Sequence, residues 1–258
     1  MSDPVFVAFA SQKGGSGKST LTALTASYLH YVEGVDVLVV DCDSRQYTQK
    51  DYRDHDIVVI NETPALKKAF MNFYKRFDKQ PYEILYATPA TAIEQAEEYM
   101  KDYPAPKVVF FDITGTINDM DLVNLLAQMH YLFIPITTDT GDMKSSIRFA
   151  NKVMSEMIAP GGSSIKEIKL VWNRIPSRKK SKLCELIDNY LEELQLSSLN
   201  TVLSNSARYS KDDGGMAARP TIFRSTMMPP DKQLLKDSDL PELVREIREI
   251  INVWPYGR

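Results

Sequence analysis

Short apolar runs alternate with amphipathic stretches along most of the chain, a pattern that predicts strands separated by helices. The apolar runs have strand length and are rich in Val, Ile and Phe. Strands are expected at 5–10, 35–40, 57–60, 82–87, 108–111, 131–134 and 168–172, with a further short strand at 199–203. Helices are expected at 19–31, 65–77, 91–102, 119–129, 143–157, 178–194 and 240–253.

Several boundaries carry their own signals. Thr91 and Asp239 are expected to cap helices, and Pro135 to stop the strand before it. The polar stretch 44–56 predicts a loop or a short helix. Strands that alternate with helices favour an α/β fold, in which helices cover both faces of a mostly parallel, twisted sheet. We expect one domain over residues 1–258.

Composition narrows the class of protein without changing this picture. The 258 residues are 43% hydrophobic and 25% charged, with a net charge of −3, which excludes a globally basic nucleic-acid binder but not a local basic face. Cys42 and Cys184 have no paired spacing, so we expect reduced thiols and a cytoplasmic protein. Neither a secretory signal nor a membrane-spanning run is expected.

A glycine-rich stretch near the start provides the first candidate chemistry. Residues 11–20 read Ser-Gln-Lys-Gly-Gly-Ser-Gly-Lys-Ser-Thr and lie between an expected strand and an expected helix. This context is typical of a phosphate-binding loop, whose backbone N–H groups and helix N-terminus bind anions. Lys18 is expected to reach the β- and γ-phosphates, and the Ser19 hydroxyl to bind Mg²⁺. The alternative is a glycine-rich turn with incidental lysines.

Carboxylates end two further strands of the expected sheet. Asp112 follows four apolar residues, which is the Walker B position for a carboxylate that holds Mg²⁺, usually through water. Asp41 and Asp43 follow the strand at 35–40, and we expect their side chains to point the same way. Ligands of open α/β sheets bind at the carboxyl ends of the strands, so these groups should converge with the glycine-rich loop. The alternative is that Asp41 and Asp43 only cap a loop.

The run Lys13-Gly14-Gly15-Ser16-Gly17-Lys18-Ser19 resembles the deviant Walker A motif, KGGxGK[ST], of the ParA/MinD family of P-loop ATPases. The run from Asp41 to Gln46 is similar to that family's Asp-x-Asp-Pro-Gln motif, although Ser44 replaces the proline. The resemblance implies a P-loop (Rossmann-like) three-layer fold. It also implies binding of ATP and Mg²⁺, and hydrolysis of ATP to ADP and phosphate.

By the same resemblance, Lys13 is the signature lysine that reaches into the site of a partner subunit in an ATP-dependent homodimer. Asp43 takes the larger role in hydrolysis, Asp41 a supporting one, and Asn173 contacts the adenine. A solvated Lys13 and a turn-capping Asn173 remain the structural alternatives. The nucleotide is expected on Lys13, Gly14, Gly15, Ser16, Gly17, Lys18, Ser19, Thr20 and Asn173, and the metal on Ser19, Asp43 and Asp112.

The resemblance to small ParA-type proteins, which lack a DNA-reading domain before the phosphate loop, also suggests partners. It implies nonspecific DNA binding by the ATP-bound dimer, association with the nucleoid, and a ParB-type stimulator. The cargo would be a plasmid, a chromosome or a conjugative mobile element. Basic residues that could contact DNA phosphates are Arg174, Arg178, Lys179, Lys180, Lys182, Arg208, Lys211, Arg219 and Arg224. A solvated helix start is an equally good interpretation of the run 177–182.

Three other functions are alternatives to this one. A MinD-like protein would place a basic amphipathic helix on a membrane, but the polar face of 240–253 mixes Glu with Arg. A bacterial tyrosine kinase shares the Asp-x-Asp-x-Arg pattern at 41–45, but Lys13-Gly14-Gly15 does not match it. A scaffold with a relic site is disfavoured because all the expected catalytic side chains are present.

Overall fold

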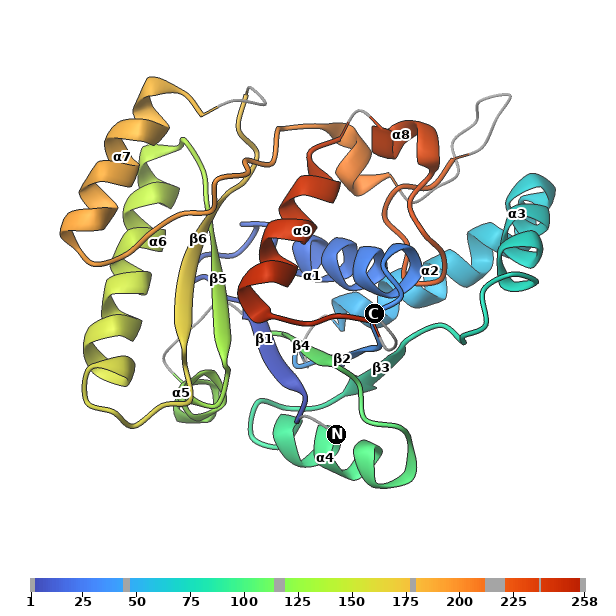
Figure 1. The fold of residues 1–258 in the computed structure, drawn as a ribbon, viewed down its shortest axis with the longest axis horizontal. Helices are drawn as coiled ribbons and strands as arrows, with labels where there is room; N and C mark the ends of the chain where they lie inside the picture. Colours follow the sequence, from blue (N-terminus) through green and yellow to red (C-terminus); the bar gives the residue numbers. More distant parts are fainter. Residues whose placement is uncertain are drawn as a thin grey trace.

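The computed structural model describes residues 3–43, 47–113, 119–176, 180–211, 221–236 and 238–255. Its strands form one sheet in the order β3-β2-β4-β1-β5-β6, and every neighbouring pair is parallel (Figure 1). The strands are β1 (Val5–Phe9), β2 (Val37–Asp41), β3 (Glu83–Tyr86), β4 (Val108–Asp112), β5 (Tyr131–Ile136) and β6 (Glu167–Trp172).

Helices connect these strands. They are α1 (Lys18–Ser27), α2 (Thr48–Glu62), α3 (Pro64–Tyr74), α4 (Ala92–Asp102), α5 (Met120–Ala127), α6 (Thr140–Val153), α7 (Lys182–Glu193), α8 (Lys232–Lys236) and α9 (Leu240–Ile251). Wider π-helical turns extend α1 over Tyr28–Val32 and α6 over Met154–Ile158, and Ala207–Ser210 form a 3₁₀ turn. None of the helices in the described ranges is both long and apolar enough to cross a membrane.

The sheet is buried on both faces because successive side chains of each strand point to opposite sides. Val7 and Phe9 of β1 pack with buried residues of α1 and α9. Ala8 and Ala10 join the opposite core, to which α4, α5, α6 and α7 contribute. Two helical layers therefore enclose one parallel sheet (Figure 1), and the predicted α/β fold class is confirmed.

The strand expected at 57–60 is wrong, because this run lies within helix α2. Its buried residues are Gln49, Asp56 and Ile60, whose spacing of seven and four fits one face of a helix. Two of these three residues are polar, so an apolar pattern could not reveal the helix. Ile57 and Val58, which suggested a strand, are 42% and 50% exposed.

Pro135 does not stop β5, which continues to Ile136. The carbonyl of Phe133 accepts a hydrogen bond from Ala10 on the β1 side, and alternate residues of a strand present their backbone groups to the same neighbour. Pro135 therefore faces the β1 side, where the register with β1 ends at Phe9 and Phe133. The backbone N–H group that proline lacks would face a position beyond the end of β1, so no hydrogen bond between strands is lost.

The segment 199–203 runs beside β6 without forming a regular strand. Leu199 and Leu203 donate backbone hydrogen bonds to the carbonyls of Leu170 and Trp172, at 2.8 Å each. Its contacts with the sheet edge otherwise reduce to isolated bridges. The segment covers the outer edge of β6 as an irregular chain.

Two expected helix caps act differently from the prediction. Thr91 and Asp239 occupy the N-cap positions of α4 and α9 without capping through their side chains. The Thr91 hydroxyl pairs with Thr88. Asp239 instead accepts hydrogen bonds from the backbone N–H and the hydroxyl of Ser204, which ties the start of α9 to the chain beyond β6.

Three central strands end at the same edge of the sheet. Asp112 lies opposite Phe9 on one side and opposite Asp41 on the other. The turn from β1 into α1 passes over this edge. The register alone therefore brings the carboxylates that end β2 and β4 next to the glycine-rich loop.

Candidate functional site

The loop between β1 and α1 has the backbone of an anion site. Gly17, the last residue before α1, has a φ of 95°, which side-chain-bearing residues rarely adopt. A Cβ at this position would lie 2.7 Å from Nδ2 of Asn173. Glycine is therefore required at position 17 both by backbone conformation and by the close approach of Asn173.

A cavity of about 280 Å³ opens above this loop. The residues that line it are Gly14, Gly15, Gly17, Lys18, Ser19, Thr20, Asp43, Thr48, Tyr52, Ile113 and Arg174. Lys18 is buried, and its Nζ donates to the carbonyl of Lys13 at 3.3 Å. Burial lowers the pKa of Lys18, while the charges of Asp112 and Asp43 oppose that shift. The cavity thus places a lysine, a glycine-rich backbone and a helix N-terminus around one anion-sized space.

Ser19 and Asp112 lie in contact beneath the cavity. The Ser19 hydroxyl donates to Oδ1 of Asp112 at 3.0 Å, and Asp112 is 1% exposed. Burial raises the pKa of the Asp112 carboxyl to about 7, against hydrogen bonds from Gln49 and Ser19 that lower it. A hydroxyl and a carboxylate side by side are oxygen donors of the kind that Mg²⁺ prefers. These two residues fit the expected metal, and a bound cation would favour the ionised carboxylate.

Asp41 and Asp43 do not point the same way, because β2 ends at Asp41. Asp41 is fully buried; its Oδ1 accepts from the backbone N–H of Asp43, and its Oδ2 accepts from those of Gln49 and Lys50. It therefore holds the first turn of α2. Asp43 lines the cavity. Only the second carboxylate of this motif faces the space above the phosphate loop.

Lys13 points away from the cavity. Its ammonium forms an ion pair with Asp142, in the first turn of α6, and its side chain is 55% exposed. The hydrogen bond with Asp142 raises the pKa of Lys13, and the charge of Asp142 adds to the shift. In the single chain, the signature lysine is held at the surface by its own subunit.

Asn173 and Arg174 approach the loop from the end of β6. Nδ2 of Asn173 donates to the carbonyl of Ser16 at 3.0 Å, and Nη1 of Arg174 donates to the carbonyl of Gly15 at 2.8 Å. Both residues line a second, smaller cavity of about 70 Å³ whose other side is formed by 203–206 and 209–210. Asn173 thus contacts the loop directly, and its expected contact with the adenine stays a prediction.

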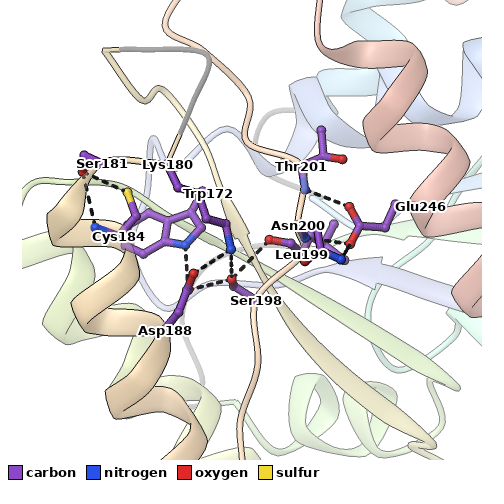
Figure 2. A network of polar contacts seen from close by, with 10 residues as sticks. All are labelled: Trp172, Lys180, Ser181, Cys184, Asp188, Ser198, Leu199, Asn200, Thr201 and Glu246. Atoms are coloured by element: carbon purple, nitrogen blue, oxygen red, sulfur yellow. Dashed lines mark hydrogen bonds and ion pairs between the residues drawn. The ribbon is translucent and has the colours of Figure 1, made fainter.

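Among the described residues, those proposed to bind DNA lie on several different elements of the chain. Arg178, Lys179 and Arg219 lie outside the described residues. Lys180 is bound within the chain: its Nζ pairs with Oδ2 of Asp188 at 2.6 Å and donates to the Ser198 hydroxyl at 2.9 Å (Figure 2). Asp188 also accepts a hydrogen bond from the indole N–H of Trp172. Lys182, in the first turn of α7, is exposed.

Two arginines of the same set are used within the chain. Nη1 of Arg208 donates to the carbonyl of Leu234 at 2.9 Å. The guanidinium of Arg224 stacks over the ring of Tyr52, 3.6 Å from its centroid. Lys211 is half-buried. The basic residues in this part of the chain therefore serve partly to fix its own structure.

Sequence reasoning missed Gln49, Thr48 and Tyr52, and it assigned Arg174 to the DNA set. Arg174 follows a strand directly, so the rule that strand ends converge could have placed it at the site. The other three belong to α2, whose buried face is polar. For them the sequence offers no specific signal, because the polar stretch 44–56 predicts either a loop or a short helix.

The fold and the site define a P-loop nucleotide-binding protein. The CobQ/CobB/MinD/ParA nucleotide binding domain matches residues 7–214, and the chain belongs to this family. The resemblance drawn from the deviant Walker A motif is thereby confirmed at the level of the family. No curated protein matches the chain in sequence.

Solved structures share the fold along nearly the whole chain. A putative plasmid partition protein from Borrelia burgdorferi B31 bound to AMPPNP has a TM-score of 0.58 at 16% identity, covering 96% of this chain and 100% of that one. An ATP complex of McdA from Cyanothece has a TM-score of 0.61 at 15% sequence identity, covering 100% of both chains. A chain of the MinC:MinD cell division protein complex from Aquifex aeolicus has a TM-score of 0.58 at 16% sequence identity, covering 99% of this chain and 98% of that one.

Proposed function

We propose that this protein is a ParA-like ATPase that binds Mg·ATP, forms a nucleotide-sandwich homodimer and hydrolyses the nucleotide. The observation that carries this proposal is the convergence of Lys18, Ser19 and Asp112 under a cavity lined by the glycine-rich loop. The family match supports nucleotide binding. Structural neighbours bound to AMPPNP and ATP indicate the class of nucleotide.

Each residue has a role that its position allows. Lys18 neutralises phosphate charge from inside the loop, and the backbone N–H groups of the glycines bind phosphate oxygens. Ser19 and Asp112 would hold Mg²⁺, which on binding neutralises charge on the phosphates. Asp43, exposed to the cavity, orients the attacking water. Asp41 supports Asp43 and the metal site by fixing the first turn of α2.

Lys13 is the residue through which each subunit of the proposed dimer would act on the nucleotide of the other. Added positive charge near the β- and γ-phosphates stabilises the charge that develops during phosphoryl transfer. Lys13 is on the surface and bound to Asp142, so it would exchange this partner for the nucleotide of a second subunit. The ion pair is exposed, and such pairs contribute little stability. The exchange therefore carries a small energetic cost.

DNA and a ParB-type partner are the remaining parts of the proposal. ATP-bound dimers would bind DNA without sequence preference through exposed basic residues such as Lys182, and hydrolysis would release them. Cytoplasmic dimers would thus associate with the nucleoid and position plasmid, chromosomal or mobile-element DNA. The partition proteins among the structural neighbours support this role.

A MinD-like membrane role is the alternative, and the structure of α9 disfavours it. Leu243, Val244, Ile247 and Ile251 form the apolar face of α9, and they are at most 2% exposed in the core against α1 and the sheet. A helix whose apolar face is already buried has no face left for a lipid surface.

Co-sedimentation separates the two functions. The protein is pelleted with DNA and with anionic liposomes in the presence of ATP, ADP or no nucleotide. We expect ATP-dependent pelleting with DNA alone. ATP-dependent pelleting with liposomes but not with DNA would instead support the MinD-like function and contradict the partition role.

The cross-dimer role of Lys13 has a test of its own. Lys13→Ala should retain nucleotide binding but lose ATP-dependent dimerisation and most of its hydrolysis. Lys101→Ala, which removes another exposed lysine with an acidic partner, is the matched control. A Lys13→Ala protein that dimerises and hydrolyses ATP at the wild-type rate would exclude this role.

A further inference from the structure

Gln49 is a buried polar residue that the proposed roles leave unused. It lies in the first turn of α2 and is 0% exposed. Its Nε2 donates to Oδ2 of Asp112 at 2.7 Å and to the carbonyl of Ser19 at 2.9 Å. One amide group therefore contacts both of the residues that fit the metal.

The orientation of this amide follows from its partners. A backbone carbonyl can only accept a hydrogen bond, so the NH₂ group of Gln49 must face Ser19. The amide oxygen Oε1 then points elsewhere, and in the described part of the chain it is buried with no hydrogen-bond partner. A buried polar oxygen without a partner is costly, and such atoms commonly mark a missing water or ion.

A chain of hydrogen bonds links the carboxylates of the two neighbouring strands through this residue. Oδ2 of Asp41 accepts from the backbone N–H of Gln49 at 2.8 Å. The side chain of Gln49 then holds Oδ2 of Asp112, while Ser19 holds Oδ1. Because Asp41 fixes the backbone at Gln49 and Gln49 fixes Asp112, the orientation of the Asp112 carboxylate depends on α2.

We propose that Gln49 is a positioning residue for the magnesium site. It fixes the rotamer of Asp112 beside Ser19, and its amide oxygen accepts a hydrogen bond from water that hydrates the ion. Mg²⁺ keeps several waters in such sites, so an extra acceptor in the surrounding shell is useful. This inference rests on the proposed function, since it concerns the metal of the same nucleotide site.

The proposal also gives a reason for the polar face of α2. An apolar residue at position 49 would leave Oδ2 of Asp112 with one partner fewer. Groups that orient metal ligands in this way typically change metal affinity by about 10- to 100-fold when they are removed.

Gln49→Met tests the inference because it keeps the side-chain volume and removes both polar atoms. Gln95→Met, the same change at an exposed position of α4, is the matched control. The readout is binding of a fluorescent ATP analogue, N-methylanthraniloyl-ATP, titrated with Mg²⁺ and repeated in EDTA. Thermal melting without ligand confirms that each variant folds.

We expect Gln49→Met to shift the half-saturating Mg²⁺ concentration upward by about 10- to 100-fold, with the affinity in EDTA unchanged. Gln95→Met should match the wild type. An unchanged Mg²⁺ dependence overturns the inference, and so does an equal loss of affinity with and without Mg²⁺, because that would indicate a purely structural role. If the wild-type protein fails to bind the analogue under any condition, the proposed function is wrong, and the inference, which rests on it, is wrong as well.

Discussion

Two regions of the molecule carry the proposed function, and they are built very differently. The phosphate site, formed by residues 11–20 with Asp43 and Asp112, gathers its charged groups at one edge of the sheet. The basic segment, represented by the described residues Lys180, Lys182, Arg208, Lys211 and Arg224, spreads its charges over a loop, α7 and the chain that follows α7. In the phosphate site, hydrogen bonds to the backbone and to the side chains of Ser19 and Gln49 fix the functional groups. In the basic segment, several charged groups bind other parts of the same chain.

The difference follows from what each region has to recognise. A nucleotide is bound through backbone N–H groups and a metal, which requires atoms at fixed positions. Nonspecific DNA binding requires positive charge facing phosphates, and its strength comes from the release of counterions. One chain can therefore place the groups that would hold the phosphates and the metal, whereas under the proposed function the dimer supplies Lys13 across the interface and a second set of basic residues for DNA. The predictions below test this contrast.

The largest effect is expected at Lys18. Lys18→Ala removes a buried ammonium that would contact the phosphates, and charge-assisted contacts of this kind are worth enough to lower ATP affinity by about 100-fold. Isothermal titration with ATP and Mg²⁺ measures the change, and Lys101→Ala serves as the control. Near-wild-type affinity in Lys18→Ala would mean that the cavity is not the nucleotide site.

The network around Asp188 should act on stability rather than on binding. Asp188→Ala leaves the indole N–H of Trp172 without its acceptor and removes one hydrogen-bond partner each from Lys180 and Ser198 (Figure 2). We expect a loss of about 2 kcal/mol in the free energy of unfolding, measured in urea. Asp54→Ala, an exposed change on α2, should have almost no effect. Equal stability of the two variants would show that the network contributes nothing.

A pH titration tests the core beside α1. Burial lowers the pKa of His30 below its ordinary 6.5, so the unfolded chain binds more protons than the folded one. The contribution of His30 is therefore fully present above pH 6.5 and is lost as the pH falls through that value toward the lower folded pKa. Urea unfolding between pH 8 and pH 5 measures this decline as the difference between the wild type and a variant without the histidine, because the Asp112 carboxyl, whose pKa is raised to about 7, changes the stability in the opposite direction.

His30→Phe should reduce the slope of that decline, because the position then carries no titrating group. His130, whose pKa is also lowered by burial, and Asp112, whose raised pKa changes the stability in the opposite direction, contribute equally in both proteins. Identical slopes for the wild type and His30→Phe would show that His30 does not titrate across this range.

The smallest effect is expected in DNA binding. Lys182→Ala should reduce the slope of log affinity against log salt by about 1, as expected for one phosphate contact. Lys180→Ala should leave that slope unchanged and lower the stability of the fold instead, because its charge is already paired with Asp188. If Lys180→Ala reduced the salt slope and Lys182→Ala did not, the phosphate contact would be made by Lys180 instead of Lys182.

Much of the fold and the centre of the site could be predicted from the sequence. Apolar strands and the rule that parallel strand ends converge were enough to bring Asp112 to the glycine-rich loop. Helix α2 was not predictable in the same way, because its buried face contains Gln49 and Asp56 beside Ile60, and its first turn is held by the Asp41 carboxylate. The pairing of Lys13 with Asp142 joins residues far apart in sequence and leaves no local pattern.

The central claim is that nucleotide binding switches this protein from a single chain to a dimer. Analytical ultracentrifugation of the wild type with Mg²⁺ and a slowly hydrolysed ATP analogue tests it directly. The account predicts a monomer without nucleotide or with ADP, a dimer with the ATP analogue, and a monomer for Lys13→Ala even when the analogue is bound. A wild-type protein that stays monomeric while saturated with the analogue would contradict it.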